Sequence, residues 1–373
     1  MEKGTMLENG VCCVEEESVN GGSYDVWRCQ NGLSSSSSAA AADHLVVMVH
    51  GILGSANDWK FAAEQFVRLL PDKVFVHCNE NNAAKLTLDG VDVMGDRLVE
   101  EILEVIKRRP GLRKISFVAH SVGGLVARYA IGKLYQSSSH FDSNDLSANG
   151  SLERQRGTIG GLEAINFVTV ATPHLGSRGH KQVPFLFGST ALEKLATRVI
   201  HLIFRRTGRH LFLTDNDEGK PPLLRRMVQD QSEYPFMSAL RAFRRRVAYA
   251  NVGYDHIVGW RTSSFRRASE LPKWEDALDE KYPHIVYEEH CKAHDAEQHE
   301  LSSVAESVAD WSSDKIEEEL ARGLSRVSWD KVDVSFHTSR LRFAAHSVIQ
   351  VKDHNMHTEG ADVIQHMIDH FIV

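Results

Sequence analysis

The chain has 373 residues, of which 42% are hydrophobic and 25% charged, and its formal net charge is −7. This composition is typical of a globular protein with a large core, and the negative charge argues against nucleic acid as a partner of the whole protein. The five cysteines are odd in number and irregularly spaced, which indicates reduced thiols rather than a disulfide framework. Because no signal core or membrane-spanning apolar stretch is present, we expect a cytoplasmic protein that can still contact membranes or lipid droplets peripherally.

The first part of the chain differs in composition from the rest. Residues 1–42 are polar and end in a Ser/Ala run at Ser34–Ala42, which is typical of a flexible linker. Within them, Tyr24–Cys29 has the pattern of a short edge strand. We therefore predict a mostly flexible segment over residues 1–42 and a single domain over 43–373.

Within residues 43–373, strand and helix patterns alternate. Continuous apolar runs predict buried strands at His44–His50, Val74–Cys78, Ile115–Ala119, Ala164–Ala171, Val247–Val252 and Lys331–His337. Helical periodicity occurs at Trp59–Leu70, Val91–Arg109, Leu125–Tyr135, Pro222–Gln229, Phe236–Arg246 and Ala361–Phe371. Such alternation predicts an α/β fold with a mostly parallel central sheet and helices on both faces.

Three further stretches interrupt this alternation. The polar residues 137–161 predict a surface loop, and the charged residues 261–328 predict a polar helical insertion or small cap. Residues 181–210 combine an apolar helix face with several basic side chains. This pattern fits equally well a lid that covers an active site or touches a membrane surface, and an ordinary helix packed on the core.

The most informative stretch is KISFVAHSVGGLVARYAIGKLY, Lys114–Tyr135. An apolar strand runs into a tight turn of small residues that contains Ser121, and a helix follows. This arrangement is typical of a nucleophile elbow, in which the turn exposes one side chain above the sheet. The helix start beside it offers free N–H groups where negative charge develops on a substrate. The sequence therefore makes Ser121 the candidate nucleophile.

A serine nucleophile needs a base and an acid that orients the base. In hydrolases built on such an elbow, the acid and then the histidine follow the serine along the chain, in loops at strand ends. Asp255 lies three residues beyond the predicted strand that ends at Val252, and we favour it as the acid over a mere turn aspartate. His346, His354 and His357 all lie where the base is expected, and the apolar neighbours of His346 favour it only modestly.

Other motifs bear on substrate and cofactor. The loop after the first buried strand contains Gly51-Ile52-Leu53-Gly54, so the backbone N–H groups of Ile52 and Val122 are the expected oxyanion hole. His290 and His294 are four residues apart near Cys291 and His299, but without the HExxH glutamate a solvated helix is favoured over a zinc site.

The sequence also contains short basic runs. Short basic runs at Arg244–Arg246 and Arg266-Arg267 are interpreted as solvated faces that could also contact anionic lipid. Glycine-rich phosphate loops are absent, so we expect no cofactor.

Several of these motifs together resemble a known family. VVMVHGILGSANDW, FVAHSVGGLVARYAIG, FVTVATPHLGSRG, LFLTDNDEGKPPLL and YANVGYDHIVGWRTSSFRR are similar to the lipase-like serine esterase family of plants and fungi, from about His44 to the carboxyl terminus. The resemblance implies the α/β-hydrolase fold, Ser121 as nucleophile, Asp255 as acid and His346 as base. Ala119 replaces the first glycine of the general hydrolase pentapeptide and is small enough for the turn.

The resemblance also implies an activity. We expect a serine hydrolase of lipid metabolism that degrades carboxylic esters of lipids, with acylglycerols as the favoured substrates and no metal or organic cofactor. A thioesterase, phospholipase or acyltransferase with the same triad is the alternative, because pocket and lid decide the leaving group. A non-catalytic lipid-binding or interaction module is a third hypothesis, which the intact candidate triad disfavours. The oligomeric state cannot be predicted.

Overall fold

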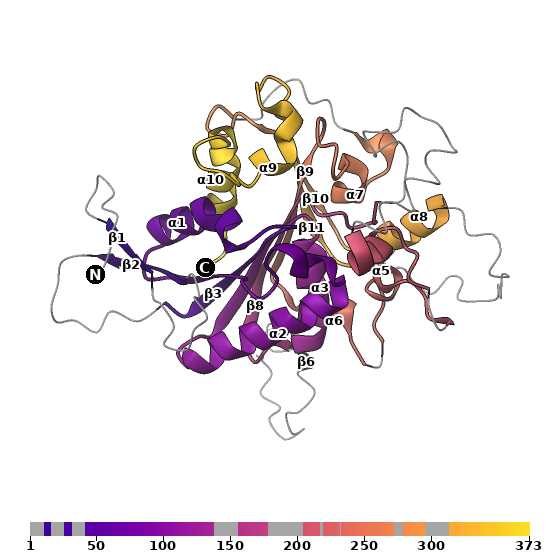
Figure 1. Cartoon of the computed structure of the whole chain (residues 1–373), viewed down its shortest axis with the longest axis horizontal. Helices are drawn as coiled ribbons and strands as arrows, with labels where there is room; N and C mark the ends of the chain where they lie inside the picture. The colour runs from indigo at the N-terminus through magenta and orange to yellow at the C-terminus, as the bar shows by residue number, and fades with distance from the viewer. Residues whose placement is uncertain are drawn as a thin grey trace, which may run out of the picture.

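A nine-stranded sheet forms the centre of the computed structural model (Figure 1). The structure describes residues 11–15, 26–31, 42–137, 156–177, 204–216, 219–231, 233–271, 279–294 and 313–373. In spatial order the strands are β1 (Val11–Glu15), β2 (Val26–Asn31), β4 (Val74–Cys78), β3 (His44–Val49), β5 (Lys114–His120), β8 (Glu163–Val170), β9 (Arg245–Asn251), β11 (Trp329–Val334) and β10 (Ile285–Cys291).

The six strands from β4 to β11 are parallel, and the outer strands β1, β2 and β10 pair antiparallel. Strand β3 lies between β4 and β5, so the chain first winds toward one edge of the sheet and then toward the other. The loops after β3 and β5 consequently meet at the carboxyl edge, where open α/β sheets bind ligands. This topology confirms the predicted α/β-hydrolase fold.

Helices cover both faces of the sheet. In Figure 1, α1 and α10 lie on one face, and α2, α3 and α6 lie on the other. The helices are α1 (Lys60–Leu69), α2 (Val91–Arg108), α3 (Gly123–Leu134), α5 (Leu223–Arg226), α6 (Phe236–Ala242), α7 (Trp260–Ser264), α8 (Ser313–Leu324), α9 (Ala345–Val348) and α10 (Ala361–Asp369). Short 3₁₀ turns span Ala56–Trp59, Ala84–Leu88, Ala268–Glu270, Arg342–Ala344 and Thr358–Gly360, and β6 (Tyr135–Gln136) pairs with β7 (Thr158–Ile159).

The core consists of two layers, one on each face of the sheet. Alternate residues of β3 divide between them: Leu45 and Val47 pack with α2 and α3, whereas Val46 and Met48 pack with α1 and α10. All residues of β3 are buried, as the continuous apolar run predicts. Burying each such side chain contributes about 1.5–3 kcal/mol, so the core fixes the strands that present the loops of the site.

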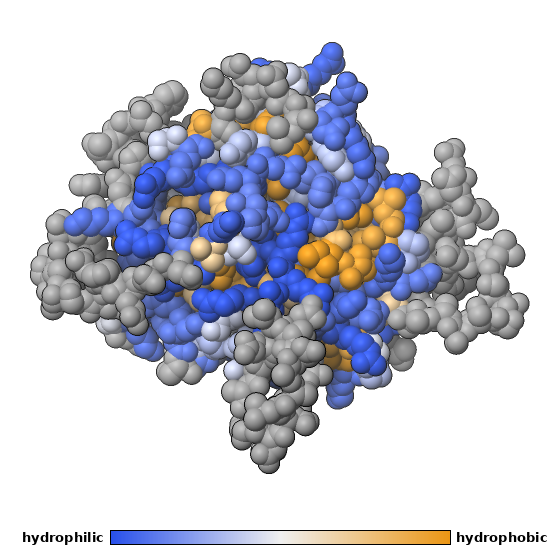
Figure 2. Space-filling view, turned by 180° about the vertical axis from the view of Figure 1, so that it is seen from behind, coloured by the Kyte–Doolittle hydropathy of each residue, from blue (hydrophilic) through white to orange (hydrophobic). Residues whose placement is uncertain are grey.

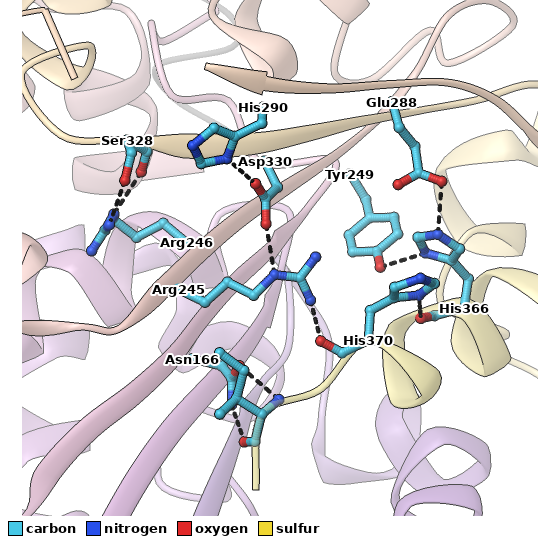
Figure 3. A network of polar contacts seen from close by, with 11 residues as sticks. Asn166, Arg245, Arg246, Tyr249, Glu288, His290, Ser328, Asp330, His366 and His370 are labelled. Carbon is cyan, nitrogen blue, oxygen red and sulfur yellow. Dashed lines mark hydrogen bonds and ion pairs between the residues drawn. The ribbon is translucent and has the colours of Figure 1, made fainter. Parts of the chain in front are cut away.

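Helix α10 is tied to the sheet by a polar network (Figure 3). The Nε2 of His366 donates to Glu288 on β10 at 3.0 Å, and its Nδ1 accepts the Tyr249 hydroxyl at 2.9 Å. Arg245 joins Asp330 on β11 at 2.6 Å and also bonds the carbonyl of His370. These contacts place the last helix against the β9, β10 and β11 strands.

The helices and the surface bear on possible membrane contact. No helix in the described part of the chain is long and apolar enough to cross a membrane. The face shown in Figure 2 is mostly hydrophilic, with hydrophobic residues gathered in separate patches.

Three sequence predictions were wrong. Residues 261–328 are not only helical, because β10 lies within them and extends the main sheet. Strand β9 begins at Arg245, inside the stretch predicted as the helix Phe236–Arg246. The basic runs are not simply solvated faces: Arg246 is buried and bonds the carbonyl of Ser328 at 2.6 Å, and Arg266 is buried against Asp333. Strand β1 was not predicted.

Candidate active site

The turn after β5 holds Ser121 in a strained conformation. Its φ is +55°, in the left-handed region that a residue with a side chain rarely adopts. The Ser121 N–H donates to the carbonyl of Val170 at 2.9 Å, and its carbonyl accepts the N–H of Gly124 at 3.1 Å. A Cβ at Gly123 would lie 2.5 Å from the carbonyl oxygen of His50, so the small residues are needed for this close approach. The predicted elbow is present.

The structure brings together the three residues predicted as a triad. The Ser121 Oγ lies 3.0 Å from Nε2 of His346, and Nδ1 of His346 lies 2.9 Å from Oδ2 of Asp255. All three residues are buried. A carboxylate only accepts, so Nδ1 of His346 carries the proton and Nε2 is free to accept the serine hydroxyl.

Asp255 follows β9 in a loop that satisfies both of its carboxylate oxygens. Oδ1 accepts the backbone N–H groups of Ile257 at 3.0 Å and Val258 at 2.8 Å, and Oδ2 accepts the side-chain amide of Asn251 at 2.9 Å. Burial alone would raise the pKa of Asp255, but His346 and these donors outweigh it and hold the pKa below its ordinary value. The Asn251 contact was not predicted, although it lies in the same YANVGYD stretch.

His346 is held in α9 and by a second histidine that the sequence did not single out. His120 Nε2 donates to the backbone carbonyl of His346 at 2.7 Å, and the two rings lie 4.5 Å apart. Burial, with the nearby His346, keeps the pKa of His120 well below its ordinary value, so His120 stays neutral. Of the other base candidates, His357 accepts the N–H of Asp353 within its own loop at 3.1 Å. In the described part of the chain, neither His354 nor His357 contacts Ser121.

The loop after β3 lies directly against Ser121. A Cβ at Gly51 would lie 2.9 Å from the Ser121 Cβ and 3.4 Å from its Oγ. Ile52 is the next residue of this loop, and Val122 is the N-cap of α3 on the other side of the serine. Within the described residues, neither the Ile52 N–H nor the Val122 N–H donates to another backbone group. An oxyanion hole requires two such N–H groups without a competing backbone acceptor.

Two further predictions concern residues outside the triad. His290 lies on β10 and donates to Asp330 at 2.6 Å, so the predicted helix carrying His290 and His294 was wrong. Among the described residues, no group of three or more His, Cys, Asp or Glu side chains could hold a metal ion.

Of the segment 181–210, residues 181–203 lie outside the described residues. Residues 204–211 are helical. Thr207 Oγ1 and His210 Nδ1 accept the N–H groups of Gly90 and Val91, each at 3.0 Å. These side chains thereby satisfy free donors at the start of α2, so this end of the segment is anchored to the domain.

The strand order and the elbow at the end of β5 define an α/β-hydrolase. The family model described as "Putative serine esterase (DUF676)" matches residues 39–266, more than half of the chain. The chain belongs to this family.

Named relatives are yeast proteins. "Putative lipase ROG1" of Saccharomyces cerevisiae is 30% identical over 230 residues, which cover 59% of this chain and 28% of the yeast protein. "Putative lipase C4A8.10" of Schizosaccharomyces pombe is 30% identical over 264 residues, which cover 68% of this chain and 29% of that protein. The match thus spans less than a third of each yeast protein.

Two of the solved structures that match are bacterial hydrolases. The Bacillus licheniformis lipase BlEst2 in mature form is 16% identical, with 59% of this chain and 70% of that chain covered and a TM-score of 0.33. The butyrate-bound Thermogutta terrifontis esterase Est2 is 13% identical, with 68% and 76% covered and a TM-score of 0.35. The fold assignment rests on the strand order of the sheet and on the family.

Proposed function

We propose that the protein is a serine hydrolase that cleaves carboxylic esters of lipids, with acylglycerols as the favoured substrates. The supporting observation is the hydrogen-bonded series from Ser121 through His346 to Asp255, which begins at a strained elbow. The proposed roles are nucleophile, base and acid, in that order. Membership in a serine esterase family supports the same activity.

In the proposed mechanism, Ser121 Oγ attacks the ester carbonyl while Nε2 of His346 takes its proton. Asp255 holds the ring and stabilises the imidazolium that forms. The N–H groups of Ile52 and Val122 bind the oxyanion of the tetrahedral intermediate. His346 then protonates the leaving alcohol, and the acyl-enzyme is hydrolysed by a water molecule that His346 deprotonates. The reaction needs no metal or cofactor.

The proposal of a lipid substrate has support from apolar side chains beside the site. Leu53, Ile257 and Phe343 are exposed by 55%, 60% and 66% and lie close in sequence to Ile52, Asp255 and His346. Thus each of three loops of the proposed site presents one large apolar side chain to its surroundings. Such side chains suit an acyl chain better than a charged substrate. The yeast relatives carry the printed name of lipases.

A fluorophosphonate probe, which labels activated serines, tests the mechanism. We expect labelling of the wild-type protein and none of Ser121→Ala, since Ser121 is the serine whose Oγ lies 3.0 Å from Nε2 of His346. Ser347→Ala, which changes a serine on α9 beside His346, is the matched control and should label normally. Lack of labelling of a correctly folded wild type would overturn the mechanism, and labelling of Ser121→Ala would overturn the choice of nucleophile.

The alternative activities separate by substrate. Turnover of acyl-thioesters or phospholipids in preference to acylglycerols would replace the lipase assignment with a thioesterase or phospholipase, and acyl transfer to an alcohol in preference to water would indicate an acyltransferase. Labelling without turnover of any acyl ester would favour the non-catalytic module.

We further propose that residues 43–373 act as one domain in which residues 181–210 form a lid that touches lipid surfaces. The support is the basic, apolar pattern of the segment and its anchored end on α2. Charging Phe185, Leu186 and Phe187 should then reduce activity on emulsified lipid more than on a soluble short-chain ester. Equal losses would contradict the lid. Cell fractionation tests the proposed cytoplasmic location with peripheral membrane or lipid-droplet contact.

A further inference from the structure

We propose that a second cavity, built on β10 and β11 and separate from the site around Ser121, binds a phosphomonoester. The cavity has a volume of about 710 Å³, and none of Ser121, Asp255 and His346 lines it. In strand register, Lys331 in this cavity pairs with Ala248 of β9, whereas Asp255 lies beyond the end of that strand. The cavity is therefore distinct from the proposed active site.

The floor of the cavity is one face of the β10–β11 pair. Glu289 and Cys291 of β10 lie opposite Lys331 and Trp329 of β11 in the ladder, and all four line the cavity. Because side chains alternate along a strand, every second residue of each strand points to this side. The walls come from α8 and from α7 with the residues that follow it. A sheet face that packed only on helices would be apolar here, but this face carries charges.

Basic side chains outnumber acidic ones around the cavity. Seven Arg and Lys residues line it, compared with four Glu residues. The four glutamates are all engaged with arginines of the lining. Glu317 pairs with Arg261 at 3.3 Å, Glu318 pairs with Arg267 at 2.9 Å, and Glu289 pairs with Arg266 at 3.0 Å. Glu270 accepts the backbone N–H of Arg267 at 2.8 Å.

The remaining cations of the lining have no acidic partner in the described part of the chain. Among the residues that the structure describes, Lys292, Arg322, Arg326 and Lys331 form no ion pair or hydrogen bond through their charged groups. The first three are exposed at the rim. Lys331 is different, because it lies on the floor and is only 6% exposed. Its ammonium group faces the Phe265 ring at 4.0 Å from the ring centroid.

The Lys331 side chain is largely buried and lines the cavity, and an ammonium group with no acceptor among the described residues favours an anionic ligand there. Burial lowers the pKa of Lys331 to about 8, which leaves the group mostly charged near neutral pH. Arg266 also lines the cavity, but its guanidinium group is already paired with Asp333 and Glu289. Within the described residues, the floor therefore offers one unpaired cation, Lys331, and the exposed residues add three more.

A phosphomonoester fits this arrangement better than a carboxylate. It carries close to two negative charges at neutral pH and three oxygens that accept in different directions. One oxygen can reach Lys331 while the others face the exposed cations Arg322 and Arg326, and arginine binds phosphate oxygens particularly well. Both a free phosphorylated metabolite and the head group of a phosphatidic acid present this chemistry.

Binding to the full chain can be measured by isothermal titration calorimetry in the Ser121→Ala background, so that hydrolysis does not contribute. The probes are inorganic phosphate, sn-glycerol 3-phosphate and citrate. Lys331→Met removes the buried charge at similar length, and Arg326→Gln alters an exposed rim cation without disturbing the core. Lys133→Met, which changes a lysine paired with Asp96 on α2, is the matched control. Sedimentation with phosphatidic acid or phosphatidylcholine vesicles tests the lipid head group.

We expect sn-glycerol 3-phosphate to bind, with Kd raised about 10–100-fold by Lys331→Met and less by Arg326→Gln, and unchanged by Lys133→Met. Sedimentation with phosphatidic acid that Lys331→Met abolishes would identify the lipid head group as the source. No binding at millimolar concentrations, equal binding of citrate, or binding that neither Lys331→Met nor Arg326→Gln weakens would overturn the proposal. If Lys331→Met fails to fold, the Kd of sn-glycerol 3-phosphate for Arg326→Gln decides whether the cavity is the binding site. The measurement does not depend on esterase activity.

Discussion

Replacing Gly51 with alanine tests the proposed oxyanion hole directly. The new methyl group would lie 2.9 Å from the Ser121 Cβ and 3.2 Å from Nδ1 of His120, whereas ordinary contacts begin at 3.4 Å. The loop must therefore retreat by about half an ångström, which is comparable with the tolerance of about 0.5 Å for a catalytic constellation. Gly51 does not have a positive φ, so the backbone itself accepts alanine. The effect then comes from displacing the N–H of Ile52.

Loss of one oxyanion donor typically lowers kcat by about 10²–10³. We expect a loss of this size in Gly51→Ala, equal in kcat and kcat/KM because the donor acts only in the transition state. Gly253→Ala is the control, since its Cβ would meet nothing within 4 Å in the loop that carries Asp255. Steady-state kinetics on a soluble short-chain ester measure both. An unchanged kcat in Gly51→Ala, or an equal loss in Gly253→Ala, would refute the reasoning.

Two further substitutions test the proposed acid, Asp255, and the buried His44. Asp255→Asn should lower kcat by about 10⁴, as the equivalent change does in a serine protease, because the amide favours the wrong tautomer of His346. A loss of less than tenfold in the rate of ester hydrolysis would exclude Asp255 as the acid. His44 accepts the Ser116 hydroxyl at 2.7 Å, and burial lowers its pKa to about 3. In the unfolded chain His44 takes up a proton as the pH falls through about 6.5, whereas in the folded chain it does not until about pH 3. The folded state therefore has its full stability above about pH 6.5 and loses part of it as the pH falls below that value. On lowering the pH from 8 to 5, His44 alone should reduce the free energy of unfolding by about 2 kcal/mol. His44→Gln should remove that part of the pH dependence in urea unfolding, and an unchanged dependence would contradict the assignment.

The sheet could be predicted where local sequence determines structure. Strands β3, β4 and β5 are continuous apolar runs because both of their faces are buried, and α2 has a regular apolar face. Strand β10 could not be predicted from the sequence, because it lies at the edge of the sheet and one of its faces lines the polar cavity. Its sequence IVYEEHC consequently contains charged residues that favour no strand pattern. Arg246 and Arg266 were misjudged for a related reason, since their buried partners are distant in sequence.

The residues of the candidate site likewise differ in how far local sequence indicates them. Ser121 and Ile52 follow strands within one or a few residues, so a short motif indicates each of them. The base could not be chosen by pattern, because His346, His354 and His357 share one region and the Ser121–His346 contact joins residues 225 positions apart. The resemblance to a family favoured His346, and the geometry places it beside Ser121. The contact of His120 leaves no signature in the sequence, because it depends on where a chain segment 226 residues away passes. The contact of Asn251 is local, four residues before Asp255, but an asparagine at the end of a strand does not by itself indicate this partner.

The elbow and the proposed base are joined by two adjacent contacts. Ser121 Oγ meets Nε2 of His346, and His120, the preceding residue, donates to the carbonyl of the same histidine. Because neighbouring side chains in the strained turn point in different directions, one turn can hold both the ring and the backbone of His346. Because burial keeps the pKa of His120 well below its ordinary value, His120 stays neutral and its contact with the His346 carbonyl does not depend on protonation of the His120 ring. The elbow thus does more than expose a serine, since it also sets the position of the group that would activate that serine.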